Sequence, residues 1–377
     1  MKEKNLRILV YITGFICLIA FIAIRNFPLM NALLSDKMDR ETKDFETYGD
    51  LYYSNNINHF KVDLPKRIRK YRLSEKNPAV NDADILTFGD SFFDFSFQKT
   101  FPERLSDTLN QKVYSFVTQD PVLSNPFCVL NQASYPLLDK PKIVIFETVE
   151  RNIPIKFTST YDISCRRNEF KKSLYNEIHA FIFKPNSEQL YSLLLKRGHF
   201  IHNIYSAIVT LRFDWFGYIS PMTAKYKMQK DPWLFYEKEF CNEPGGFYYK
   251  YSDQELNNIA DNIFRLQENL KEKYNLDLIF MPIPNKYSLY HKMINNDQYN
   301  NFLPLLYAEL DKRGVRYINL YREFSSARDT LYYGTDTHWN KKGLDKALNL
   351  MLNEMYSDSS LAVIREKKSH NDNPDNN

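Results

Sequence analysis

The stretch TFGDSFFDFS (residues 87–96) decides the fold class, because a buried strand ends in it and polar side chains follow at once. Residues 85–88 form a short apolar run, and Gly89 breaks that run into a turn carrying Asp90 and Ser91. A parallel sheet presents its chemistry at such strand ends. Ser91 is therefore a candidate nucleophile, with an ordinary polar loop residue as the alternative. The choice depends on whether the chain supplies a base for its hydroxyl.

Similar apolar runs recur along the chain and alternate with helical patterns. The runs typical of further buried strands are 113–117, 142–149, 276–283 and 315–320. Between two of them, apolar residues recur at helical spacing: Leu256, Ile259, Ile263, Leu266 and Leu270. This alternation predicts an α/β fold of three layers, a mostly parallel sheet flanked by helices. We expect it to span residues 81–356.

One segment interrupts the alternation. Residues 160–250 are rich in aromatic residues, helical in places and without obvious strands, which predicts a helical insertion over one side of the sheet. His199 and His202 lie three residues apart there, a spacing that allows both on one helix face. No acidic or cysteine ligand stands nearby, so we favour a packing or surface role and expect no metal site.

The N-terminus carries the signal of a membrane helix. An uncharged apolar run covers residues 8–24 between Arg7 and Arg25, close to the ~20 residues that cross a bilayer. Basic residues precede it, so we expect residues 1–7 in the cytoplasm and the remaining chain periplasmic or extracellular. A cleaved signal peptide is the alternative, but no small-residue cleavage site follows the run. Residues 25–80 are then a stalk that wraps onto the main body, and residues 357–377 a disordered polar tail.

Composition excludes some classes of protein. The 377 residues are 44% hydrophobic and 15% aromatic, enough for one large domain with a filled core. The formal charge is +4 and the basic residues are dispersed, which argues against a nucleic-acid partner. The four cysteines fit neither a zinc site nor a disulfide scaffold; one disulfide is compatible with them, in a pairing that the spacing leaves open.

The base for Ser91 is found near the end of the chain. In DTHWN (residues 336–340), Asp336 and His338 stand just before a predicted helix for which Asn340 is the N-cap. An imidazole accepts the serine proton, and a carboxylate on its other nitrogen fixes the tautomer. The alternative is that Asp336 caps a turn and His338 is a solvated loop residue. Since the two motifs complete each other's chemistry, we favour a Ser-His-Asp site.

These motifs resemble a known superfamily. FGDS (residues 88–91) after the first strand, with Asp-x-His near the C-terminus, is similar to the SGNH (GDSL) hydrolases, which cleave or transfer ester-linked acyl groups. The form DTHWN, with MPIPNKYSLY (residues 281–290), resembles the alginate O-acetylation proteins and related DHHW proteins. In the alginate proteins the Asp-His pair precedes the serine, whereas here the serine comes first.

The resemblance implies an oxyanion site from two intermediate loops, for which this chain lacks the usual Gly and the G-x-N-D form. Arg151 after the third strand is our candidate to face the developing charge or a sugar group, and a salt bridge to Glu147 or Glu150 is the alternative. We also assign possible substrate or oxyanion contacts, each with a structural role as the alternative, to Asp90, Phe92, Asn152, Lys286, Tyr290 and Trp339.

The sequence therefore predicts a membrane-anchored, outward-facing serine acyl enzyme that acts on acetyl esters of an exported or cell-surface polysaccharide. We favour an O-acetyltransferase that needs no cofactor and receives its acetyl group from a multi-spanning membrane O-acyltransferase. A carbohydrate esterase of the same fold and a non-catalytic carbohydrate-binding scaffold are the alternatives.

Overall fold

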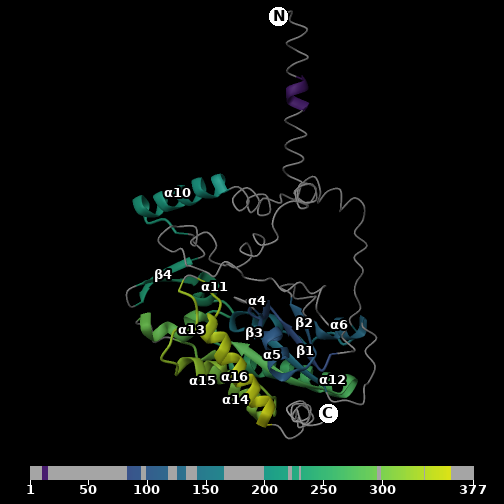
Figure 1. The fold of residues 1–377 in the computed structure, drawn as a ribbon. Helices are drawn as coiled ribbons and strands as arrows, with labels where there is room; N and C mark the ends of the chain where they lie inside the picture. The colour runs from purple at the N-terminus through teal and green to yellow at the C-terminus, as the bar shows by residue number, and fades with distance from the viewer. Residues whose placement is uncertain are drawn as a thin grey trace, which may run out of the picture. The chain divides into compact units, whose positions relative to one another are not determined.

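The computed structural model describes residues 11–15, 83–94, 99–117, 125–132, 142–164, 199–219, 223–228, 231–294, 299–334 and 336–357. Figure 1 shows their helices and strands along the chain. The chain divides into two compact units. One comprises residues 1–47, 56–59 and 167–217, and the other comprises residues 48–55, 60–166 and 218–377. The sheet and all ten candidate site residues belong to the second unit.

Four parallel strands form the central sheet, in the order β2-β1-β3-β6. They are β1 (Ile85–Gly89), β2 (Val113–Val117), β3 (Lys142–Val149) and β6 (Leu276–Ile283). The parallel sheet flanked by helices confirms the predicted α/β class. The predicted strand at 315–320 is wrong: only Tyr317 bridges to Phe280. The Asn319 side chain accepts the N–H of Arg322 at 3.0 Å and thereby starts a helix where the strand would continue.

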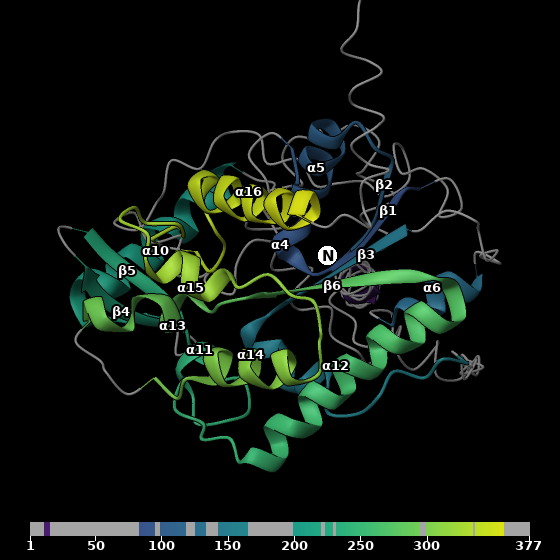
Figure 2. The ribbon, with the colours of Figure 1, turned by 90° about the horizontal axis from the view of Figure 1, so that it is seen from below.

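Side chains of β3 alternate between the two faces of the sheet. Ile143 and Ile145 join the hydrophobic cluster that includes α5 (Phe101–Leu109), α15 (Leu320–Ser325) and α16 (Lys341–Ser357). Val144 and Phe146 join the cluster that includes α6 (Pro126–Gln132), α12 (Asp253–Tyr274) and α14 (Phe302–Lys312). Figure 2 shows α5 and α16 on one side of β6 and α12 and α14 on the other. These are the three predicted layers.

The sequence explains where the long helix α12 begins and where it ends. Ser252 and Glu255 form a capping box, in which the Ser252 hydroxyl accepts the N–H of Glu255 and the Glu255 carboxylate accepts that of Ser252. Asn275 ends the helix with a φ of 52°, a left-handed conformation that asparagine tolerates well. Its buried residues include the five predicted from helical spacing.

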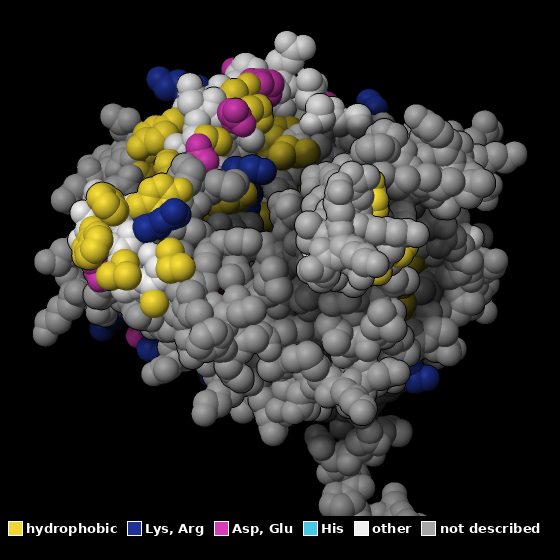
Figure 3. All heavy atoms as spheres, turned by 90° about the horizontal axis from the view of Figure 1, so that it is seen from above, with side chains coloured by type: hydrophobic (Ala, Val, Ile, Leu, Met, Phe, Trp, Pro, Cys, Tyr) yellow, Lys and Arg dark blue, Asp and Glu magenta, His cyan; other side chains and the backbone are white. Residues whose placement is uncertain are grey.

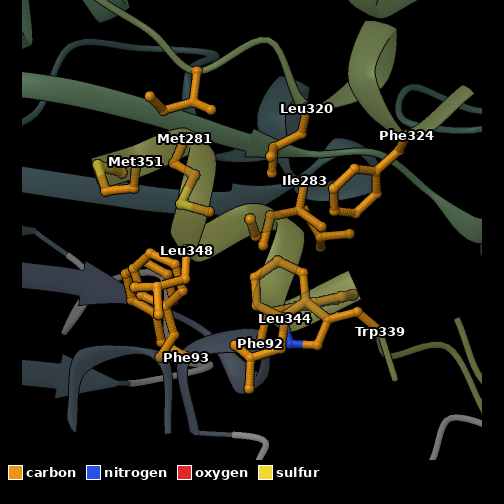
Figure 4. Close-up of a cluster of buried hydrophobic side chains, with 14 of the residues drawn as sticks. Phe92, Phe93, Met281, Ile283, Leu320, Phe324, Trp339, Leu344, Leu348 and Met351 are labelled. Carbon is orange, nitrogen blue, oxygen red and sulfur yellow. The ribbon is translucent and has the colours of Figure 1, made fainter. Parts of the chain in front are cut away.

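The first cluster reaches the region of Ser91. Figure 4 shows Phe92 and Phe93, directly after Ser91, lying near Trp339, Leu344 and Leu348. The rings of Phe92 and Trp339 are edge to face, with centroids 5.1 Å apart. Both side chains are fully buried. This packing joins the start of the sheet to the loop and helix near the end of the chain, and so brings the two sequence motifs together.

The predicted insertion is not purely helical. It contains α10 (His199–Phe216), the antiparallel strands β4 (Thr223–Met228) and β5 (Asp231–Tyr236), and α11 (Glu237–Phe240). α10 belongs to the first compact unit and the hairpin to the second. The view from above shows exposed hydrophobic side chains among the described residues (Figure 3). On α10 they are Ile208, Leu211, Trp215 and Phe216.

His199 and His202 both lie on α10. Among the residues that the structure describes, no group of three or more His, Cys, Asp or Glu side chains is arranged to hold a metal ion.

None of the helices in the described part of the chain combines the length and apolar character of a membrane span. Of the predicted anchor, residues 8–24, only residues 11–15 are described, and they are helical. The predicted stalk lies outside the described residues, as does the predicted tail beyond Ser357. Cys128 forms a disulfide bond, whereas Cys241 is free.

Candidate active site

Ser91 lies where β1 gives way to α4 (Ser91–Asp94), at the carboxyl end of a central strand. Asp90 precedes it and accepts the N–H of Phe92 on Oδ1 at 3.2 Å, which fixes the turn. The chain passes close to a side chain at Gly89: a Cβ there would lie 2.4 Å from Glu147 Oε2, so any other residue would force that buried carboxyl group to move. The glycine thus allows β1 to pass close to the carboxylate of β3, and Ser91 follows at a defined point of the turn.

The loop of residues 332–339 carries Asp336 and His338 and is closed at its base. Tyr332 and Trp339 form an antiparallel bridge, and the Tyr333 N–H donates to the His338 carbonyl at 3.1 Å. Asn340 then caps α16, since its Oδ1 accepts the N–H of Lys342 at 2.9 Å and of Gly343 at 3.1 Å. The predicted N-cap is confirmed, and it fixes where the loop ends.

Ser91, His338 and Asp336 form one chain of hydrogen bonds. His338 Nε2 lies 2.8 Å from Ser91 Oγ, and His338 Nδ1 lies 2.6 Å from Asp336 Oδ1. The same Oδ1 accepts the backbone N–H of His338 at 2.8 Å. Asp336 and His338 are buried, whereas Ser91 is partly exposed. In this arrangement the imidazole can take the serine proton while the carboxylate holds the ring.

A buried carboxyl pair includes Asp90, the residue directly before Ser91. Glu147 Oε2 accepts the N–H of Asp90 at 2.6 Å, and both side chains are buried. Burial and the neighbouring charge of Asp90 raise the pKa of Glu147 well above its usual range. Burial also acts to raise the pKa of Asp90, but the charges of Lys156 and Arg151, together with hydrogen bonds to Phe92 and Glu147, outweigh it and hold that pKa below the ordinary value. The pair is therefore asymmetric: Asp90 holds its proton less tightly than a free carboxyl does, and Glu147 holds its proton more tightly.

Arg151 and Asn152 follow β3 in the short helix η5 (Glu150–Asn152). Arg151 Nη1 lies 3.4 Å from Glu239 of α11. The alternative to a substrate contact was a salt bridge from Arg151 to Glu147 or Glu150. Arg151 does form an ion pair, but with Glu239. Asn152 Nδ2 donates to Asp90 Oδ2 at 3.5 Å and is partly exposed. Of these two residues, Asn152 is the one linked to the turn that carries Ser91.

The structure places three of the other candidates in the core. Phe92 and Trp339 pack against each other, and the Phe92 ring lies 4.8 Å from the His338 ring, so they support the imidazole. The Tyr290 hydroxyl accepts the N–H of Leu331 at 2.8 Å, and 6% of the residue is exposed. Apolar rings fill the space behind the loop, which explains why these residues do not line an open surface.

Lys286 is fully buried and donates to three backbone carbonyls, two of them in the loop of residues 332–339. Glu239, which sequence analysis did not single out, is also fully buried and accepts the N–H of Tyr287 at 3.1 Å. No local pattern marks Glu239, because its partners come from distant parts of the chain.

A separate cavity of about 570 Å³ lies near α15 and the end of α16. Its lining includes Arg316, Arg322, Glu323 and Glu354, and none of the ten candidate site residues. Arg316 and Glu354 are paired there at 2.7 Å. We place the candidate site at Ser91 rather than in this cavity, because among the described residues Ser91, His338 and Asp336 bring a nucleophile, a base and an acid into contact.

Comparison with protein families gave a match over part of the chain. A family model described as "SGNH hydrolase-like domain, acetyltransferase AlgX" matches residues 228–367. The resemblance to this SGNH family is confirmed. The AlgX-like match includes β6, α16 and the loop with Asp336 and His338, and it does not reach Ser91. The structure supplies that connection by bringing Ser91 onto His338.

Comparisons with curated proteins and with solved structures gave no significant match. The AlgX-like family description supports an SGNH acyltransferase-like or hydrolase-like domain in residues 228–367.

Proposed function

We propose that this chain is a serine acyl enzyme that transfers acetyl groups to hydroxyls of an exported or cell-surface polysaccharide. The observation that carries the proposal is the hydrogen-bonded chain from Ser91 through His338 to Asp336, at 2.8 Å and 2.6 Å. It joins residues far apart in sequence at the carboxyl end of a parallel strand, where α/β folds bind substrates. The acetyltransferase named in the family description favours transfer over hydrolysis.

The reaction runs in two halves. Ser91 Oγ attacks the acetyl carbonyl while His338 Nε2 takes its proton, and the imidazolium then returns that proton to the leaving oxygen. A polysaccharide hydroxyl next attacks the acetyl-serine and gives its proton to His338. The bond between Ser91 Oγ and the acetyl carbon then breaks, His338 returns the proton to Ser91 Oγ, and the sugar leaves as its acetyl ester. If water takes the place of the sugar hydroxyl, the same site is an esterase. The acceptor alone separates the two functions.

Negative charge develops on the acetyl oxygen in both halves and needs donors. Asn152 is the candidate side chain, because its Nδ2 already lies 3.5 Å from Asp90 Oδ2 and the residue is partly exposed. Arg151 is tied to Glu239. Its guanidinium adds positive charge near Asp90.

The trapped intermediate tests the proposal. When the purified chain is mixed with an aryl acetate and quenched within milliseconds, we expect one acetyl group on the peptide that contains Ser91. Mass spectrometry of the digest locates it, and Ser91→Ala should carry none. Addition of an oligosaccharide acceptor should then yield acetylated sugar. Free acetate without acetylated sugar would indicate the esterase, and the absence of both acetyl-Ser91 and turnover would leave a binding scaffold.

We also propose that the catalytic unit lies outside the cytoplasm, anchored by residues 8–24 in the cytoplasmic membrane. The apolar run and its basic flank support this orientation. The disulfide of Cys128 supports an oxidising compartment as well. Since acetyl-CoA is cytoplasmic, such an enzyme needs an acetyl donor in the membrane, for which a multi-spanning O-acyltransferase is the expected class.

Protease accessibility tests the orientation. We expect protease added to intact spheroplasts to digest the chain beyond the anchor, because the proposed topology exposes residues 25–377 to the medium. Immunoblotting with antibodies against a C-terminal epitope follows the digestion, and a cytoplasmic protein in the same sample reports leakage. Full protection until the membrane is opened with detergent would reverse the proposed topology.

A further inference from the structure

Lys286 is a buried cation that takes no part in the proton transfer described above. It is the first residue of α13 (Lys286–Tyr290), and none of its surface is exposed. Its Nζ lies 2.7 Å from the Leu234 carbonyl of β5, 2.7 Å from the Gly334 carbonyl and 3.1 Å from the Asp336 carbonyl. One side chain thus connects the insertion hairpin to the loop that holds the acid and the base.

The three acceptors match an ammonium group. A protonated lysine has three N–H donors, one for each carbonyl, whereas a neutral amine has two and would turn a lone pair toward the third oxygen. Aromatic faces add to the preference for a cation, since Nζ lies 4.6 Å from the centre of the Trp233 ring and 4.9 Å from that of Phe235. The geometry therefore selects the charged form.

We propose that Lys286 is a positioning residue, whose ammonium group holds the Asp336–His338 loop in register with Ser91 by binding the Leu234, Gly334 and Asp336 carbonyls. The inference rests on the proposed function, because it assigns a role in that same site. Asp336 is held twice: its carbonyl by Lys286, and its carboxylate by His338. If the first contact is lost, the carboxylate can shift, and the imidazole shifts with it.

Burial, partly offset by two neighbouring carboxylates, sets the pH at which Lys286 loses its proton. Burial lowers the pKa of Lys286 to about 7, against the opposing effects of Glu239 and Asp336. Glu239 comes from α11 and Asp336 from the loop, while β5 contributes the Trp233 and Phe235 rings and the Leu234 carbonyl. As the pH rises through about 7, the ammonium loses its proton and one of the three hydrogen bonds. The rate should therefore fall on the alkaline side.

Lys286→Met keeps the length of the side chain and removes its donors. We expect kcat for an aryl acetate to fall on the order of 10²-fold, the effect of a misplacement of about 1 Å, with KM nearly unchanged. The alkaline decline of the wild-type rate should also disappear. Lys341→Met is the matched control, because Lys341 is exposed on α16 and pairs with Asp345. It should keep both the rate and the decline.

Hydrogen exchange separates this inference from the proposed function. In Lys286→Met, amides of residues 331–340 should exchange faster, while those of β1, β3 and β6 keep their protection. If wild-type Ser91 is never acetylated, the proposed function fails. The hydrogen-exchange rates of Lys286→Met and of the wild type then still show whether Lys286 holds the loop. Unchanged exchange together with an unchanged kcat in Lys286→Met would overturn the inference. If that variant does not fold, Lys286→Gln, which is neutral and shorter, replaces it in both measurements, and the same pair of unchanged results would overturn the inference.

Discussion

Replacing His338 with alanine should lower the acyl-transfer rate by a factor on the order of 10⁶, as loss of the histidine base does in a serine protease. The physical reason is that Nε2, 2.8 Å from Ser91 Oγ, is the group placed to accept the serine proton. Without it the hydroxyl stays a weak nucleophile at neutral pH. Turnover of an aryl acetate measures the rate, and a fluorophosphonate probe measures the reactivity of Ser91 directly.

His291→Ala is the matched control. His291 is also buried, but it packs against the rings of Phe247 and Tyr299. Its removal should leave labelling of Ser91 intact in whatever fraction of the protein stays folded, which circular dichroism reports. Undiminished labelling of folded His338→Ala would remove His338 from the mechanism.

Asp336→Asn should reduce turnover by a factor on the order of 10⁴, the loss seen for the same exchange in a serine protease. Asp336 Oδ1 accepts the backbone N–H of His338 and lies 2.6 Å from Nδ1. An amide can still cap the backbone with its oxygen, but it can also present an N–H to the ring. The ring then carries its proton on Nε2, where it cannot accept one from Ser91.

This exchange separates catalysis from capping. Asparagine caps a turn about as well as aspartate does, so a purely structural Asp336 predicts near-normal turnover after the substitution. Asp329→Asn is the control, since Asp329 is exposed and pairs with Lys342 at 2.7 Å. Both variants should unfold at temperatures close to that of the wild type. An Asp336→Asn enzyme with wild-type turnover would leave the carboxylate without a catalytic role.

Short apolar runs were sufficient to predict the four strands of the sheet. Strands buried on both faces need continuous apolar side chains, which stand out in a polar sequence. The same argument failed for residues 315–320. Val315 and Ile318 are buried as expected, yet the chain turns into α15 after a single bridge to β6, because Asn319 caps that helix. Burial was predictable there, and the length of the strand was not.

The sequence by itself determined where the site's parts stand along the chain. A glycine turn after a strand places Ser91 at the carboxyl end of that strand, and an asparagine N-cap places the Asp-x-His just before a helix. Both are local features, set by the conformations that a few neighbouring residues prefer.

Only the tertiary structure decided which distant groups meet. It paired Arg151 with Glu239 rather than with a nearby acid, and it enclosed Lys286 among three carbonyls. Every residue carries a backbone carbonyl, so a binding site made of backbone carbonyls cannot be recognised from the residue types in the sequence. A buried ammonium group is stable only where hydrogen bonds to protein oxygen atoms replace its bonds to water. The tertiary structure therefore determines where such a charge can lie, because it brings those oxygen atoms together.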